Sequence, residues 1–276
     1  MLCAETYGPG GGPPIVLIGG ASSSMDWWVP GFCRQLAAAT AGRVIRYDHR
    51  DTGRSPACPA GEPDYTGADL ADDVLTLADG PLHLVGVSMG GAIAQRVAIE
   101  HPGRVASLTL IATTFAAGGP GDLPPPEPRV RAAFGEPPPD WRDRDAAVER
   151  ITADVGRLSG TIPADPEEVR ELARRVFDRT TDMAAAQTNH WILPDGRPLT
   201  GRTADITAPT AVLHGTHDPL FPPPHGAALA AAIPGARLVE LPGMGHEVPP
   251  RPLWPLVIGE IVKVTAAGYV PGTTGR

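Results

Sequence analysis

The chain has few cysteines and no concentrated positive charge. Cys3, Cys33 and Cys58 are an odd number at unrelated spacings, without a CxxC pair, so neither a disulfide framework nor a zinc site is predicted. The formal net charge is -8 and no long Lys/Arg run occurs, which removes the electrostatic surface that nucleic acids or anionic membranes attract. We therefore expect reduced cysteines and a small-molecule partner.

The sequence also lacks targeting and membrane-spanning segments. Its first residues contain no basic segment followed by a long apolar core, and Gly, Pro or charged residues interrupt every apolar run before about 18 residues. Motifs for a zinc protease, paired catalytic carboxylates or a phosphate-binding loop are absent as well. We expect a cytoplasmic protein that needs no metal or organic cofactor, and its oligomeric state stays open.

Short apolar runs bounded by Gly, Pro or Asp alternate with segments of helical spacing. The apolar runs, which we interpret as strands, are 15–18, 44–47, 82–85, 108–111, 210–214 and 238–241. The helical segments are 32–41, 68–78, 91–100, 224–232 and 253–267. This alternation predicts an α/β fold with a mostly parallel sheet and helices on both of its faces.

The alternation breaks between residues 118 and 201. This stretch contains proline clusters and charged helical segments near 143–158 and 166–177, and no obvious strand. Segments of this length are rarely structureless inside a compact domain. We therefore predict a helical cap at 118–201, inserted before the late strands of a core that consists of 1–117 and 202–276.

The strongest chemical signal is the segment Gly86-Val87-Ser88-Met89-Gly90-Gly91. It follows the apolar run LHLV and opens the helical segment AIAQRVAIEH, which is the strand, sharp turn and helix that a nucleophile elbow requires. Glycines beside the serine allow a turn in which larger side chains would collide with the neighbouring backbone. The turn exposes the Ser88 hydroxyl at a helix N-terminus, where developing negative charge is stabilised.

A serine hydroxyl needs a base, usually an imidazole that a carboxylate orients. Asp218 follows the predicted strand TAVLH, and His246 follows the predicted strand LVEL within Pro-Gly-Met-Gly-His. The carboxyl ends of parallel strands share one edge of a sheet, so these loops can converge on Ser88. We predict a triad of Ser88, Asp218 and His246, and we expect His49 and His83 to be structural.

With its serine, aspartate and histidine in this order, the chain resembles the α/β-hydrolase fold family, in its serine hydrolase branch. The resemblance implies an oxyanion hole made by two backbone N–H groups, one of them from Met89, the residue after the nucleophile. The second donor is implied at Gly20, because Gly19-Gly20-Ala21 resembles the family's HG-x loop with Ile18 in place of the histidine.

Patches of the core resemble the aclacinomycin methylesterases of anthracycline tailoring, namely VIRYDHRDTGRS, VGVSMGG, HDPLFPPPHGAALAAAIPGARL and PGMGH. This resemblance implies hydrolysis of a carboxylic ester, such as a methyl ester or lactone of a polyketide-like small molecule, through an acyl-enzyme. The short N-terminus departs from the pattern and raises the expectation that the first strand of the usual sheet is missing. Candidate contacts to a ring-rich substrate are Trp28, Phe134, His190 and Trp191.

Other functions of the same scaffold stay open at this point. A triad also serves biosynthetic enzymes that catalyse cyclisation, acyl transfer or C–C cleavage, and some hydrolase-derived receptors retain one. A carboxylic ester hydrolase is the function that the sequence favours. Chemistry that needs an aspartate nucleophile is disfavoured because position 88 is a serine.

Overall fold

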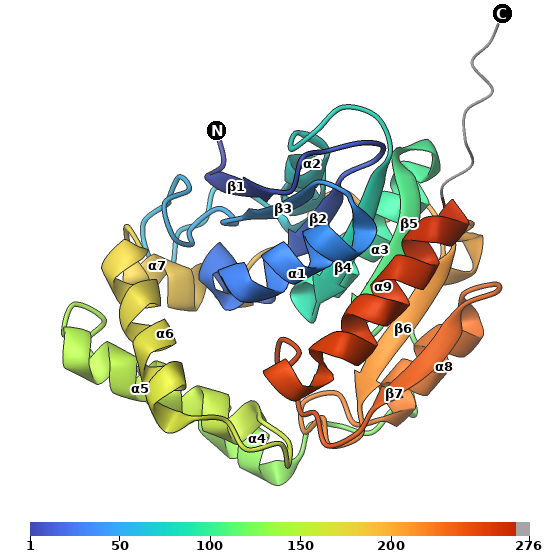
Figure 1. The fold of residues 1–276 in the computed structure, drawn as a ribbon. Helices are drawn as coiled ribbons and strands as arrows, with labels where there is room; N and C mark the ends of the chain where they lie inside the picture. Colours follow the sequence, from blue (N-terminus) through green and yellow to red (C-terminus); the bar gives the residue numbers. More distant parts are fainter. Residues whose placement is uncertain (269–276) are drawn as a thin grey trace, which may run out of the picture.

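The computed structural model describes residues 1–268 of the chain, and in these residues a seven-stranded sheet forms the centre of the fold (Figure 1). The spatial order of the strands is β1-β3-β2-β4-β5-β6-β7. Only the β1/β3 pair is antiparallel, and every other pair is parallel. The strands are β1 (Ala4–Tyr7), β2 (Ile15–Ile18), β3 (Val44–Tyr47), β4 (Leu82–Val87), β5 (Val105–Ile111), β6 (Thr210–Gly215) and β7 (Arg237–Leu241).

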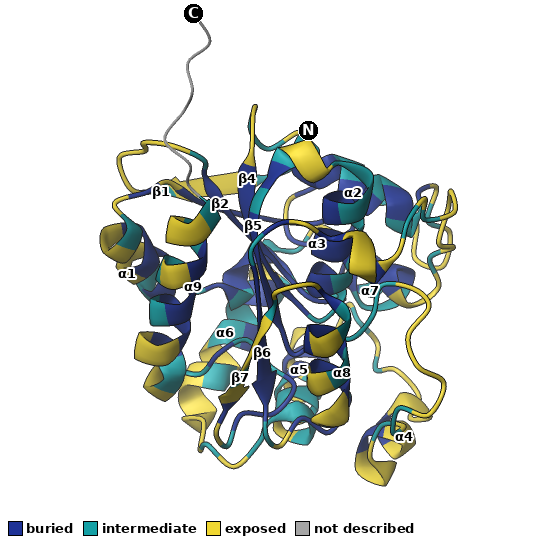
Figure 2. Ribbon diagram, turned by 90° about the vertical axis from the view of Figure 1, so that its right-hand side faces the viewer, coloured by how far each residue is buried: buried dark blue, intermediate teal, exposed yellow. Residues whose placement is uncertain are grey.

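Helices cover both faces of this sheet, as the alternating pattern predicts. Helices α1 (Pro30–Thr40) and α9 (Trp254–Gly268) pack on one face. Helices α2 (Gly67–Leu75), α3 (Met89–Glu100) and α8 (Pro224–Ala232) pack on the other. Figure 2 shows the sheet between these two layers, with its five inner strands buried and the edge strands β1 and β7 mostly exposed. The six predicted strands and the mostly parallel sheet are confirmed.

The sequence did not reveal strand β1. Its residues AETY are mostly exposed, so they lack the apolar run that marks the other strands. The strand forms at the sheet edge by pairing with β3, and Glu5 forms a salt bridge with Arg46 at 2.6 Å. An edge strand needs only one hydrogen-bonded neighbour, so its sequence carries little hydrophobic signal.

Residues between β5 and β6 form helices and no strand. The helices are α4 (Pro128–Phe134), α5 (Arg144–Leu158), α6 (Pro166–Arg179) and α7 (Met183–Thr188), followed by a 3-10 turn at Asn189–Trp191. Aspartate side chains cap α5, α6 and α7 by accepting hydrogen bonds from the first backbone N–H groups. No helix in residues 1–268 is long and apolar enough to cross a membrane.

Candidate active site

Ser88 occupies a sharp turn between β4 and α3. Its backbone has φ 53° and ψ -120°, a combination that few non-glycine residues adopt. A Cβ atom on Gly86 would lie 2.2 Å from the Gly90 carbonyl oxygen, and one on Gly90 would lie 2.4 Å from the Ile18 carbonyl oxygen. The elbow glycines are therefore needed because neighbouring backbone fills the space that side chains would occupy.

The side chains of Ser88, His246 and Asp218 form one hydrogen-bonded chain. The Ser88 hydroxyl lies 2.9 Å from His246 Nε2, and His246 Nδ1 lies 2.9 Å from Asp218 Oδ2. Because the carboxylate accepts a hydrogen bond from Nδ1–H, the neutral ring carries no hydrogen on Nε2, and this nitrogen can accept the proton of the serine hydroxyl. The structure thus brings together three residues separated by 158 and 28 positions along the chain.

Asp218 is held as a buried carboxylate with several donors around it. Its side chain is 1% exposed, and its Oδ1 accepts hydrogen bonds from the Leu220 and Phe221 backbone N–H groups at 2.9 and 2.8 Å. The Phe221 ring also contacts the His246 ring edge-on, with centroids 5.2 Å apart. These contacts fix both the acceptor for Nδ1–H and the plane of the imidazole.

The loop that carries His246 is held by backbone from the segment between β5 and β6. The His246 N–H donates to the Leu158 carbonyl at 2.8 Å, and the Thr161 N–H donates to the Gly243 carbonyl at 2.8 Å. A Cβ atom on Gly245 would lie 2.2 Å from the Leu158 carbonyl oxygen. The glycines of the Pro-Gly-Met-Gly-His segment therefore permit two backbones to approach closely.

Two backbone N–H groups beside Ser88 have no protein acceptor among residues 1–268, namely those of Gly20 and Met89. Met89 is the first residue of α3, where N–H groups lack intrahelical acceptors and the helix dipole favours negative charge. A Cβ atom on Gly20 would lie 3.4 Å from the Ser88 Cβ, so the Gly20 backbone borders the nucleophile. Both positions suit donors to an oxyanion formed at Ser88.

Of the four predicted substrate contacts, Trp28 and His190 are buried, and Phe134 and Trp191 are exposed. Trp28 is 2% exposed and packs on Phe32 beneath α1, with ring centroids 5.4 Å apart, so it belongs to the core and not to a pocket. Both ring nitrogens of His190 bond the protein itself, Nδ1 to the Ser22 N–H and Nε2 to the Arg50 carbonyl, each at 3.0 Å. Trp28 and His190 are therefore buried and expose little surface to a ligand.

Phe134 and Trp191 remain at the surface. They are 55% and 56% exposed, and their ring centroids lie 5.6 Å apart. The Trp191 indole N–H donates to the Ser22 hydroxyl at 3.0 Å, which ties this aromatic pair to the Gly19–Ser24 loop beside the nucleophile. The pair is thus an exposed aromatic surface attached to the loop that also contains Gly20.

The sequence gives no sign of one contact in this region, which His49 makes. His49 is 1% exposed, and its Nε2 lies 3.1 Å from the Gly19 carbonyl oxygen. It was expected to be structural because its sequence surroundings resemble an ordinary turn. The only signal was its position in the DHR segment, which does not reveal a contact made 30 residues away.

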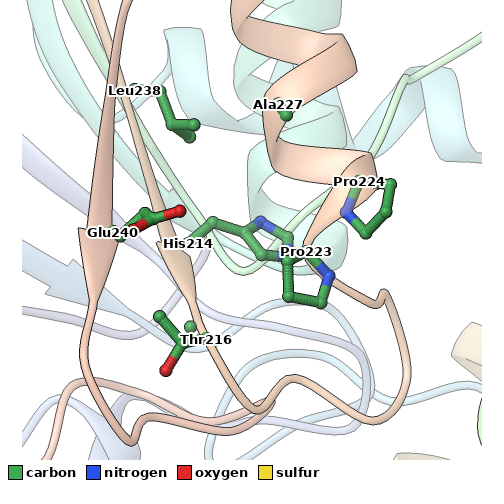
Figure 3. A pocket seen from close by; sticks show the side chains of 8 residues that line it. His214, Thr216, Pro223, Pro224, Ala227, Leu238 and Glu240 are labelled. Carbon is green, nitrogen blue, oxygen red and sulfur yellow. The ribbon is translucent and has the colours of Figure 1, made fainter.

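A hollow lined by residues of β6, β7 and α8 lies apart from the Ser88, His246 and Asp218 side chains. Figure 3 shows this hollow, of about 330 Å³, between β6, β7 and the start of α8, with His214, Pro223 and Glu240 on its walls. None of Ser88, Asp218 or His246 lines it. Within residues 1–268, no group of three His, Cys, Asp or Glu side chains is arranged to hold a metal ion.

Comparison with known proteins adds independent evidence. Residues 13–249 match the family model described as alpha/beta hydrolase fold. The chain is 33% identical to rhodomycin D methylesterase of Streptomyces peucetius, over 90% of this chain and 89% of that protein. It is 28% identical to the pimeloyl-(acyl-carrier protein) methyl ester esterase of Aeromonas hydrophila, over 86% and 89%. The enol-lactonase from Burkholderia xenovorans LB400 matches with a TM-score of 0.71 and 28% identity over 96% of both chains.

Proposed function

The chain belongs to the alpha/beta hydrolase family, and we propose that it is a carboxylic ester hydrolase whose catalytic residues are Ser88, His246 and Asp218. One observation carries the assignment: the Ser88 hydroxyl lies 2.9 Å from His246 Nε2, while Nδ1 of the same ring lies 2.9 Å from Asp218. An imidazole in this position can remove the serine proton as the oxygen attacks a carbonyl carbon. The esterase relatives support the same reaction class.

The proposed reaction has two halves. Ser88 Oγ attacks the ester carbonyl, His246 Nε2 accepts its proton, and the Gly20 and Met89 N–H groups stabilise the oxyanion. His246 then gives the proton to the departing alcohol, which leaves an acyl group on Ser88. Water, deprotonated by the same imidazole, attacks the carbonyl carbon of this acyl-enzyme. The bond to Ser88 Oγ then breaks, the imidazole returns the proton to Oγ, and the acid is released.

We propose a methyl ester or lactone of a ring-rich small molecule as the substrate. Two of the relatives are named for methyl ester cleavage, and the third comparison is named an enol-lactonase. Phe134 and Trp191 support this choice, since two aromatic faces near Ser22 can pack against a planar substrate. We take residues 118–201, which contain both side chains, as the cap that determines specificity.

Several features support a small-molecule enzyme of the cytoplasm. The net charge of -8 disfavours nucleic acid as a partner, and Cys3, Cys33 and Cys58 are all free. Each step proposed above needs only side chains and backbone of this chain. No cofactor is therefore part of the proposal.

Hydrolysis of p-nitrophenyl butyrate and of methyl 2-naphthoate by the purified chain tests this proposal. We expect Ser88→Ala to lower kcat by about 10⁴-fold or more for both esters, because the nucleophile is lost. Ser107→Ala is the control, since Ser107 is a buried serine on the neighbouring strand whose hydroxyl bonds His83. A Ser88→Ala variant with wild-type kcat would assign the chemistry to another residue, and binding of ligand without turnover by wild type would favour a receptor.

A further inference from the structure

We propose that His49 is a positioning residue that sets the oxyanion hole by holding the peptide group between Gly19 and Gly20. The inference rests on the proposed function, since it concerns the same hole. In a trans peptide, the carbonyl and the N–H point in opposite directions and move as one plane. The Gly19 carbonyl and the Gly20 N–H belong to one such plane, so a side chain that holds the carbonyl also aims the N–H.

His49 makes this contact from a rigid and buried position. Its Nε2–H donates to the Gly19 carbonyl at 3.1 Å, and the residue is 1% exposed in the loop that follows β3. Its Nδ1 is buried and has no hydrogen-bond partner among residues 1–268. A buried nitrogen without a partner costs about 1–3 kcal/mol, so packing alone favours an apolar side chain at this position. The Nε2 contact is the feature that an apolar side chain cannot supply.

Donation to a carbonyl has an electronic consequence as well. Hydrogen bonds through one peptide group polarise each other, so a bond accepted by the Gly19 oxygen strengthens the donor character of the Gly20 N–H. Burial lowers the pKa of His49 to about 4, so the ring is neutral at ordinary pH and has a single N–H. Because Gly19 offers only an acceptor, that hydrogen resides on Nε2.

His190 holds the other end of the same loop. Its Nδ1 accepts the Ser22 N–H, and its Nε2–H donates to the Arg50 carbonyl, next in the chain to His49. The two imidazole rings meet edge to face, with centroids 5.7 Å apart. Asn189 anchors this turn by donating to Asp51 at 2.8 Å and accepting the Gly61 N–H at 2.7 Å. The 189–191 turn therefore locks the ring of His49 against the loop that it positions.

Matched substitutions at His49 separate hydrogen bonding from packing. His49→Phe keeps a ring of similar size and removes the donor, whereas His49→Gln places an amide N–H near the former Nε2. We expect His49→Phe to lower kcat for p-nitrophenyl butyrate by about 10-fold to 100-fold with KM nearly unchanged, part of the loss seen when an oxyanion donor is deleted. His49→Gln should recover most of this loss.

Inhibition by phenylboronic acid gives a second readout, because its tetrahedral adduct with Ser88 places an oxygen in the hole. Its inhibition constant should rise in His49→Phe by about the factor that kcat/KM falls, as expected for a contact that acts on the transition state. His83→Phe is the control, since His83 is also buried but bonds Ser107. It should change neither kcat nor the inhibition constant.

The outcomes are distinguishable. If wild type hydrolyses the ester and Ser88→Ala does not, but His49→Phe matches wild type in kcat and in boronate affinity, the role of His49 is refuted and the proposed function stands. Equal losses in His49→Phe and His49→Gln, with boronate affinity retained, also refute it. If His49→Phe does not fold, His49→Asn replaces it, because its shorter amide does not reach Gly19. Absence of hydrolysis by wild type contradicts the proposed function itself.

Discussion

Mild acid should destabilise this protein through histidines that are buried in the neutral form. Burial lowers the pKa of His49, His83 and His190 to about 4, against an ordinary value of 6.5. A lowered folded-state pKa means that the unfolded chain binds more protons as the pH falls. The stabilising contribution is thus fully present above about pH 6.5 and is lost progressively as the pH falls toward about 4.

The shifts give the size of this effect. Between about pH 7.5 and about pH 5, each of these histidines should lower the free energy of unfolding by at most about 2 kcal/mol. The three together approach about 6 kcal/mol, a large part of the 5–15 kcal/mol that a typical domain possesses. His214, whose pKa burial also lowers, acts in the same direction. Most carboxylates titrate below about pH 5, so this window isolates the histidines.

Urea unfolding followed by tryptophan fluorescence at several pH values measures the effect. His83→Gln removes one titrating group near the start of β4, whereas Ser88 follows the end of that strand. Its unfolding free energy should therefore depend on pH less steeply than that of wild type, by up to about 2 kcal/mol over this range. His217→Gln is the control because the His217 side chain is exposed. Identical pH dependence in His83→Gln and wild type would show that His83 is not buried in the neutral form.

Three further predictions concern the elbow, the triad and a buried ion-pair cluster. Gly90→Ala should abolish esterase activity and destabilise the chain, since its Cβ would lie 2.4 Å from a backbone oxygen. Gly156→Ala is the control, because open space surrounds this position in α5, and we expect it to raise the free energy of unfolding by about 0.5–1 kcal/mol in thermal unfolding experiments. Asp218→Asn should lower kcat by about 10³-fold to 10⁴-fold with KM retained in steady-state assays, because the imidazole loses its orienting anion; activity within about tenfold of wild type would contradict this role. Arg179→Gln should lower the free energy of unfolding by about 3 kcal/mol in urea titrations, because Arg179 bridges the buried carboxylates of Asp26 and Asp48. Its loss removes the salt bridge of Asp48, whereas Asp26 keeps the one with Arg175 at 3.3 Å. Unchanged stability would mean that other groups neutralise Asp48.

Local patterns in the sequence were sufficient to predict the parallel sheet and the sharp turn at Ser88. Buried strands in a parallel sheet must be apolar along their whole length, and the elbow must carry small residues where backbones nearly touch. The fold class and the family resemblance are confirmed by the sheet and by the family match. Ser88, Asp218 and His246 could be predicted to converge because Ser88 follows β4 and the other two lie in the loops after β6 and β7, and the carboxyl ends of parallel strands share one edge.

Contacts between distant side chains depended on the tertiary structure. Trp28 is of a residue type that often contacts ligands, but it is buried beneath α1. Both ring nitrogens of His190 form hydrogen bonds within the protein. Strand β1 exists because β3 offers it a hydrogen-bonded edge, which no feature of AETY predicts.

The sequence by itself determined which backbone turns are possible, because glycine spacing and apolar periodicity act over a few neighbouring residues. The tertiary structure decided which side chains hold those turns in place. His49 and Gly19 are 30 residues apart, and only the packing of parallel strands brings the imidazole to that carbonyl. Such a contact depends on the position and rotamer of a buried ring, which are set by three-dimensional packing and leave no periodic trace along the chain.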